Sequence, residues 1–157
     1  MFTKEVISQQ PIALLDTQTP IGTFHWPRTV AVNSTGDIFV ADTQNNRIQI
    51  FNPSGGTNGT FGFADNNPDD ASLNQPYGIH INGTDFIFVA DTFTNVIKVF
   101  SPGGSYLSTI GTAGTETGEY YYPSGVSSNS THIFIADTFN NRIQITDLSG
   151  NTVDTIP

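Results

Sequence analysis

Three closely similar thirteen-residue segments constrain the fold of this 157-residue chain more than any other feature. They are IFVADTQNNRIQI at residues 38–50, IFVADTFTNVIKV at 87–99 and IFIADTFNNRIQI at 133–145. Each begins with four apolar, β-prone residues, continues through a polar turn opened by Asp-Thr, and ends with alternating apolar and polar residues. This pattern predicts one β-hairpin per segment.

Each hairpin is the middle of a larger repeating unit. A proline and a short apolar strand precede it at residues 27–32, 76–81 and 123–128, and a turn with a fourth strand follows at 59–63, 105–110 and 151–156. The aspartates of the hairpins are 49 and then 46 residues apart. Four strands recurring at that period indicate β-propeller blades. We therefore predict an all-β single domain over 1–157, with blade 1 at 21–63, blade 2 at 71–111 and blade 3 at 118–156.

The pattern Pro-x-Gly-apolar followed by I-F-V-A-D-T-x-N-x-R-I-Q resembles the NHL repeat. This resemblance covers nearly the whole chain and implies blades of four antiparallel strands from a six-bladed β-propeller, of which three blades would be one half. Two departures from the family pattern stand out. Thr94 and Val96 stand where the other two copies have asparagine and arginine, and Thr29 stands where the family has glycine.

An open arc of three blades would expose an apolar face at each end. At about 25 cal/mol per Å², a face of roughly 400 Å² left in water would forfeit roughly 10 kcal/mol, which is comparable to the stability of a whole domain. We therefore expect closure as a two-fold homodimer or a larger self-assembly. The alternative is an excised fragment of a longer propeller. Residues 10–16 resemble an orphan outer strand, which would compete with 151–156 for one edge.

The charge balance excludes some partners. Fourteen acidic residues against five basic ones give a formal net charge of −9, which argues against nucleic acid and against an anionic membrane surface. With no cysteine, neither disulfides nor thiolate metal sites are available. The first residues lack the pattern of a signal peptide, and no apolar stretch reaches a membrane-spanning length. No cofactor is expected.

Asp42, Asp91 and Asp137 each end a second strand, on the face that carries the second-to-third strand turns and the connections between blades. We call this face the top. One interpretation is a ring of carboxylates that holds a cation. The other is a set of buried turn caps, two of them paired with Arg47 and Arg142. Asp91 has no matching arginine and is expected to be the freest.

Some propellers with this resemblance are zinc-dependent lyases, which directs attention to the histidines. His25, His80 and His132 occupy different positions in the repeat, so they are not expected to converge on a metal, and His80 is expected to pack near the channel. The loop at residues 65–70 has oxygen ligands at alternating positions. It lacks the glycine and the glutamate of a calcium-binding loop and is interpreted as solvated.

Side chains near the first-strand prolines form the candidate binding surface of the top face. The functional interpretation is contact with an extended peptide or a sugar, because aromatic faces with polar tips suit both. The alternative is packing between neighbouring blades. The surface consists of Trp26, Arg28, Tyr77, Tyr121 and Tyr122.

Four Asn-x-Ser/Thr sequons occur, at Asn33, Asn58, Asn82 and Asn129. Three are placed in the first-to-second strand turn of successive blades and Asn58 in a third-to-fourth strand turn, all on the bottom face. They are either glycosylation sites or simply good hairpin turns. Used sequons would favour an extracellular or cell-surface protein, and unused ones a soluble fragment.

These observations favour a non-enzymatic binding and assembly module, a half-propeller that self-associates and offers its top face to protein or glycan. The alternative is a metal-dependent propeller enzyme, of the lyase or lactone-hydrolase type, with a cation in the channel. RNA binding, known for some proteins with such repeats, is disfavoured by an acidic top face without lysines.

Overall fold

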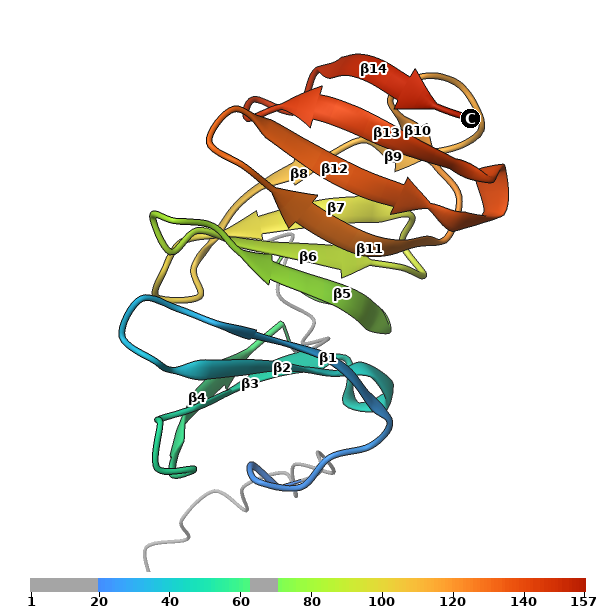
Figure 1. The fold of residues 1–157 in the computed structure, drawn as a ribbon. Helices are drawn as coiled ribbons and strands as arrows, with labels where there is room; N and C mark the ends of the chain where they lie inside the picture. Colours follow the sequence, from blue (N-terminus) through green and yellow to red (C-terminus); the bar gives the residue numbers. More distant parts are fainter. Residues whose placement is uncertain (1–19, 63–70) are drawn as a thin grey trace, which may run out of the picture.

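The computed structural model describes residues 20–62 and 71–157 and is all-β, as predicted. Three four-stranded antiparallel sheets follow one another in chain order, with blade 2 between blades 1 and 3 (Figure 1). The proposed strand at 10–16 and the loop at 65–70 lie outside the described residues. No helix among the described residues is long and apolar enough to cross a membrane.

In each blade the strands pair with their neighbours in sequence order. Blade 1 consists of β1 (Pro27–Val32), β2 (Ile38–Asp42), β3 (Arg47–Phe51) and β4 (Thr57–Phe61). Blade 2 consists of β5 (Pro76–Ile81), β6 (Ile87–Asp91), β7 (Val96–Phe100) and β8 (Tyr106–Ile110). Blade 3 consists of β11 (Pro123–Ser128), β12 (His132–Asp137), β13 (Arg142–Asp147) and β14 (Thr152–Ile156). A short parallel pair, β9 (Thr112–Ala113) and β10 (Glu119–Tyr120), lies in the connection between blades 2 and 3.

The turn after each second strand ends on a left-handed asparagine in all three blades. In blades 1 and 3 it is a single 3-10 turn, η1 (Thr43–Asn45) and η2 (Thr138–Asn140). The chain then passes through a left-handed residue, with φ of 52° at Asn46, 62° at Asn95 and 52° at Asn141. Asparagine tolerates this region better than most residues. The asparagine that recurs in the repeat is therefore what allows the hairpin to close.

The cores lie between the blades rather than within them. Phe39, Ile48 and Leu73 pack with residues of blade 2 at the first junction, and Phe88 and Ile135 belong to the cluster at the second. Blade 2 thus buries one face on each neighbour. Since a single four-stranded sheet leaves both faces in water, each blade depends on its neighbours for most of its apolar burial.

The innermost strands approach closely where the repeat has glycine. A Cβ placed on Gly78 would lie 2.8 Å from the carbonyl oxygen of Ser124 in β11. At the matching position of blade 1, Thr29 instead donates a hydrogen bond of 2.6 Å to the carbonyl oxygen of Tyr77. The threonine that departs from the family pattern therefore makes a polar contact across the first junction.

Candidate functional site

Asp42 is the hub of a buried polar cluster on the top face of blade 1. Its Oδ2 accepts hydrogen bonds from Arg47 Nε at 2.7 Å, Asn45 Nδ2 at 2.8 Å and Gln49 Nε2 at 2.8 Å. Its Oδ1 accepts one from the backbone N–H of His25 at 2.7 Å. Both oxygens are thus occupied by groups of blade 1 and of the connection that leads into it.

The arginine of the cluster extends the contact to the preceding connection. Arg47 Nη2 donates to the carbonyl oxygens of Pro20, at 3.1 Å, and Thr23, at 3.0 Å. The Asp42–Arg47 pair therefore fastens the segment that enters β1 to the β2–β3 turn. Charge-assisted hydrogen bonds of this kind are stronger than neutral ones.

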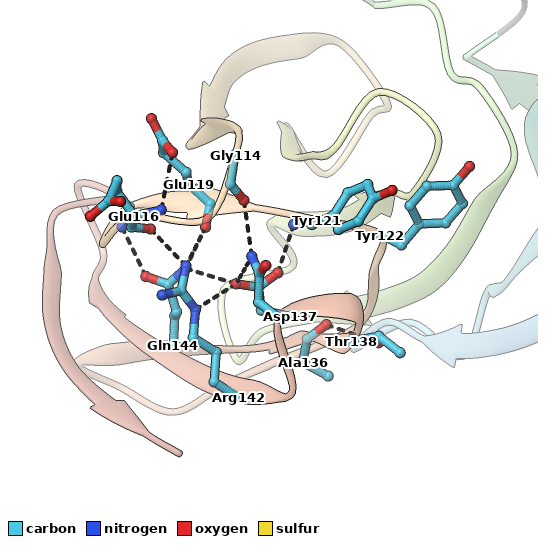
Figure 2. Close-up of polar contacts among 12 residues, drawn as sticks. Gly114, Glu116, Glu119, Tyr121, Tyr122, Ala136, Asp137, Thr138, Arg142 and Gln144 are labelled. Carbon is cyan, nitrogen blue, oxygen red and sulfur yellow. Dashed lines mark hydrogen bonds and ion pairs between the residues drawn. The ribbon is translucent and has the colours of Figure 1, made fainter.

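Blade 3 repeats this arrangement around Asp137 (Figure 2). Asp137 Oδ2 accepts from Arg142 Nε at 2.7 Å, Asn140 Nδ2 at 2.9 Å and Gln144 Nε2 at 3.1 Å. Its Oδ1 accepts from the backbone N–H of Tyr121 at 2.7 Å. Arg142 Nη2 in turn donates to the carbonyl oxygens of residues 116 and 119 in the preceding connection.

The expectation that Asp91 would be free is wrong. Its carboxylate accepts hydrogen bonds from Thr94 Oγ1 at 2.5 Å and from the backbone N–H of Asn74 at 2.6 Å. Lys98 Nζ lies 3.6 Å away and also donates to the carbonyl oxygen of Ser72. Lysine at the position of Gln49 thus supplies the cation that arginine supplies in blades 1 and 3.

The pKa values of two of these carboxyl groups shift in opposite directions. Burial raises the pKa of Asp91, and the hydrogen bonds from Thr94 and Asn74 and the charge of Lys98 offset this only in part. Burial also opposes ionisation of Asp42, but its hydrogen bonds together outweigh burial and hold its pKa below the usual 3.8. The arginine-paired carboxylate is therefore the better stabilised of the two.

The histidines act separately in the structure. His25 contributes its backbone to the Asp42 cluster, His80 lies half-buried with Nε2 3.0 Å from Ser128 Oγ, and His132 contacts its neighbour Thr131 through Nδ1. Among the residues that the structure describes, no group of three or more His, Asp or Glu side chains could hold a metal ion. The three buried aspartates tie the turn after the second strand to the connection that precedes the first strand, through the backbone N–H groups of His25, Asn74 and Tyr121.

The aromatic residues of the top face form a row that crosses the second blade junction. The guanidinium of Arg28 lies 3.7 Å from the ring centre of Tyr77, and the Tyr77 ring centre is 6.2 Å from that of Phe93. Phe93 meets Tyr122 of the next blade edge-on at 5.0 Å. Tyr122 stacks on Phe139 at 4.6 Å.

Tyr121 completes this row, since its ring lies 5.4 Å from those of both Tyr122 and Phe139. Figure 2 shows the two tyrosines side by side, next to the Asp137 cluster that holds the Tyr121 backbone. We call Arg28, Tyr77, Phe93, Tyr121, Tyr122 and Phe139 the top-face aromatic row. It contains four of the five residues singled out from sequence, and Trp26 makes no aromatic ring contact within the described part of the chain.

Phe93 and Phe139 were missed in the sequence analysis, although the signal was present. Both follow the Ala-Asp-Thr of a hairpin, at the first turn position that blade 1 fills with Gln44. Both side chains are exposed. An apolar ring in a solvent-facing turn that needs no apolar residue is the feature that marks them.

Three of the four sequon asparagines cap their own turns. The side-chain oxygens of Asn33, Asn82 and Asn129 accept backbone hydrogen bonds from residues two to four positions ahead. Asn58 is instead the second residue of β4, outside the predicted turn, and donates to Asp37 at 2.9 Å.

A cleft of about 480 Å³ near these turns lies between blades 2 and 3, lined in part by His80.

The fold and the repeated hairpin clusters define an NHL-type propeller, and the sequence comparisons agree. The NHL repeat matches residues 24–51, and the 6-bladed beta-propeller family matches residues 66–156, more than half of the chain. The chain belongs to this family of six-bladed, NHL-repeat β-propellers. No curated protein matches it.

Solved structures share this fold. A streptogramin B lyase matches with a TM-score of 0.62 at 16% identity, over 81% of this chain and 39% of the lyase. Virginiamycin B lyase from Staphylococcus aureus matches with a TM-score of 0.65 at 17% identity, over 84% of this chain and 41% of the lyase. Hydrazine synthase from Kuenenia stuttgartiensis matches with a TM-score of 0.64 at 14% identity, over 82% of this chain and 35% of the synthase chain. The chain therefore spans less than half the length of each of these proteins.

Proposed function

We propose that this chain is a non-enzymatic binding and assembly module. Its three blades close into a ring with a second copy, and the ring presents the top-face aromatic row to a protein or glycan. The observation that carries the proposal is the contrast between equivalent apolar positions at the internal junctions and at the two ends of the arc.

At the blade 1 end, side chains that are buried elsewhere are exposed. Phe24 precedes β1 as Leu73 precedes β5 and Tyr120 precedes β11, yet Phe24 is 44% exposed whereas Leu73 and Tyr120 are 1% and 0% exposed. Val30 of β1 is 63% exposed, while its counterpart Ile79 is 7% exposed. Phe24 and Val30 are thus exposed at positions that a neighbouring blade covers at the internal junctions.

The blade 3 end shows the complementary difference. Ile156 of β14 is 52% exposed, although its counterpart Ile110 of β8 is 5% exposed against blade 3. Phe134 is half-buried where Phe39 and Phe88 are buried. An apolar face at each end of three blades, in a family of six-bladed rings, supports closure by one further set of three.

The top-face aromatic row supports the binding part of the proposal. Its rings combine apolar faces with the hydroxyl groups of three tyrosines, a composition enriched at contact surfaces. The carboxylates that an enzyme of the alternative class would use for a cation are already engaged by arginine, lysine and amide groups. This supports a binding role over a metal-dependent reaction.

Sedimentation velocity of the purified chain tests the assembly. We expect a species of about 34 kDa, twice the 16.9 kDa of one chain, and a Phe24→Asp/Val30→Asp variant that sediments as a single chain. Phe93→Ala is the control and keeps the wild-type mass, because Phe93 lies at an internal junction. A wild-type chain that stays at 17 kDa at micromolar concentration would refute the proposed closure.

Glycan and peptide arrays test the binding surface. Tyr77→Ala and Phe93→Ala are each expected to abolish the binding of any ligand that the wild-type chain captures, while the mass of the assembly stays unchanged. Ligands whose capture survives both substitutions would bind elsewhere, and the top-face aromatic row would then not be the contact surface. Metal content of the purified protein, measured by mass spectrometry, tests the enzymatic alternative.

A further inference from the structure

The two internal junctions share a three-part contact at the top of the blades. At the first junction, Thr43 Oγ1 donates to the carbonyl oxygen of Pro76 at 2.7 Å. Asn46 Oδ1 accepts from the backbone N–H of Gln75 at 2.8 Å. The side chain of Gln44, between these two residues, donates to that of Gln75 at 3.3 Å.

The second junction repeats each part with one change of chemistry. Thr92 Oγ1 donates to the carbonyl oxygen of Pro123 at 2.8 Å, and Asn95 Oδ1 accepts from the backbone N–H of Tyr122 at 2.8 Å. The pair between side chains is now aromatic, with Phe93 and Tyr122 5.0 Å apart. We call this three-part contact the junction clasp.

One half of a third clasp is present on blade 3. Thr138, Phe139 and Asn141 occupy the positions of Thr92, Phe93 and Asn95. All three are exposed. Thr138 bonds only within its own blade among the described residues, and it approaches the Ser124 hydroxyl to 2.5 Å instead of a proline carbonyl.

The other half is present on blade 1. Trp26 and Pro27 occupy the positions of Tyr122 and Pro123. Trp26 has the same left-handed backbone, with φ of 52° against 53° at Tyr122, a conformation that bulky residues rarely adopt. The backbone N–H of Tyr122 donates to Asn95 Oδ1, and no described residue accepts a hydrogen bond from the backbone N–H of Trp26.

The two side chains that would form the aromatic pair are also the most exposed aromatics of the described residues. Trp26 is 66% exposed and Phe139 is 57% exposed. Trp26 precedes β1 and Phe139 follows β12, and blade 2 lies between blades 1 and 3 (Figure 1). Within one chain they therefore have no route to each other, whereas a second copy brings blade 1 against blade 3.

We propose that a second copy of this chain completes this clasp. Trp26 of one copy packs on Phe139 of the other, and the backbone N–H of Trp26 donates to Asn141 Oδ1 of that other copy. The Thr138 hydroxyl beside Asn141 donates to the carbonyl oxygen of Pro27 in the first copy. The two-fold symmetry forms the clasp twice. This inference rests on the proposed ring closure and adds the residues that determine it. The clasp also extends the top-face aromatic row across the boundary between the two copies.

Self-association measured by sedimentation tests the clasp. Trp26→Ala and Phe139→Ala are each expected to weaken dimerisation by roughly 100-fold or more, because large aromatic anchors dominate interfaces and each substitution removes two copies of the contact. Phe93→Ala, at the same repeat position inside the chain, is the matched control and leaves the dimerisation constant unchanged. Equal dimerisation of the Trp26→Ala and wild-type chains would overturn the clasp.

A cysteine trap supplies a second measurement, because the chain has no cysteine of its own. Trp26→Cys/Phe139→Cys is expected to give a covalent dimer under mild oxidation, and neither single variant should. The Phe93→Cys/Tyr122→Cys chain calibrates the geometry through its internal crosslink. A dimer in solution whose mass resists Trp26→Ala and which does not crosslink would overturn the clasp alone. A wild-type monomer would overturn the ring closure as well, and would point to further blades of a longer chain as the occupant.

Discussion

Replacing Asp42 by alanine is expected to remove a large part of the stability of this protein. The substitution deletes a carboxylate that accepts four hydrogen bonds and leaves Arg47 buried without its counter-charge. Breaking a buried ion pair by removing one partner costs about 3–5 kcal/mol. Because whole domains are stable by only about 5–15 kcal/mol, the variant should lie close to the limit of folding at 37 °C.

Urea unfolding at one fixed protein concentration measures this loss, since self-association would make stability concentration-dependent. The single tryptophan, Trp26, directly follows the residue whose N–H bonds to Asp42, so its fluorescence reports on the affected turn while circular dichroism reports on all blades. Asp154→Ala, an exposed position in β14, is the control and should change stability by less than about 0.5 kcal/mol.

A double substitution separates the ion pair from other effects. Asp42→Ala/Arg47→Met removes the uncompensated charge and puts an apolar chain in its place, so it should be more stable than Asp42→Ala alone. An Asp42→Ala cost below about 1 kcal/mol, or a double variant less stable than Asp42→Ala, would refute this role of the buried ion pair.

The pH dependence of the same variant has a defined sign. The folded-state pKa of Asp42 lies below its usual 3.8, so its ionised form stabilises the fold fully above pH 3.8, and this contribution is lost as the pH falls through the lower, folded-state value. The stability difference between the wild-type and Asp42→Ala chains should therefore be constant near neutrality and shrink in stronger acid. A difference that grows on acidification would contradict the pKa assignment.

The remaining predictions concern blade 2. Lys98→Gln removes the cation beside Asp91 and should cost about 1–3 kcal/mol at pH 7; adding Val96→Arg, which copies blades 1 and 3, should restore most of this loss in urea unfolding. Gly78→Ala should lower stability by about 1–3 kcal/mol because its Cβ meets backbone of blade 3 at 2.8 Å. Gly83→Ala is the matched control, since nothing lies within 4 Å of its Cβ, and a thermal melt that shifts equally for both glycine variants would show that the close approach has no energetic consequence.

The strands of the repeat could be predicted because their sequence signal is local. Alternating apolar residues predict a strand in any context that buries one face, and the Asp-Thr-x-x-Asn turn ends on the left-handed asparagine that the structure shows at Asn46. The pairing of Asp42 with Arg47 could be predicted for the same reason. Its arginine partner lies five residues away, within one hairpin.

The error at Asp91 has a physical explanation. Val96 stands at the position of Arg47, so the aligned repeats offer no cation there, but the structure uses Lys98, two residues further along β7. Residues two apart in a strand point to the same face, and the long lysine side chain reaches the carboxylate from there. Lys98 is therefore recognisable as the partner of Asp91 by the strand face it shares with Val96, not by its aligned position.

Comparison of equivalent positions across blades distinguishes two kinds of exposed aromatic residue. Phe93 is 37% exposed and Phe24 is 44% exposed, so surface area alone would give them the same role. Phe93 belongs to the middle blade and stays exposed although both neighbouring blades are in place. The counterparts of Phe24, Leu73 and Tyr120, are buried wherever a preceding blade exists. The exposure of Phe93 is therefore a property of the finished surface and that of Phe24 a property of the open end, which is why we assign the first to ligand contact and the second to assembly.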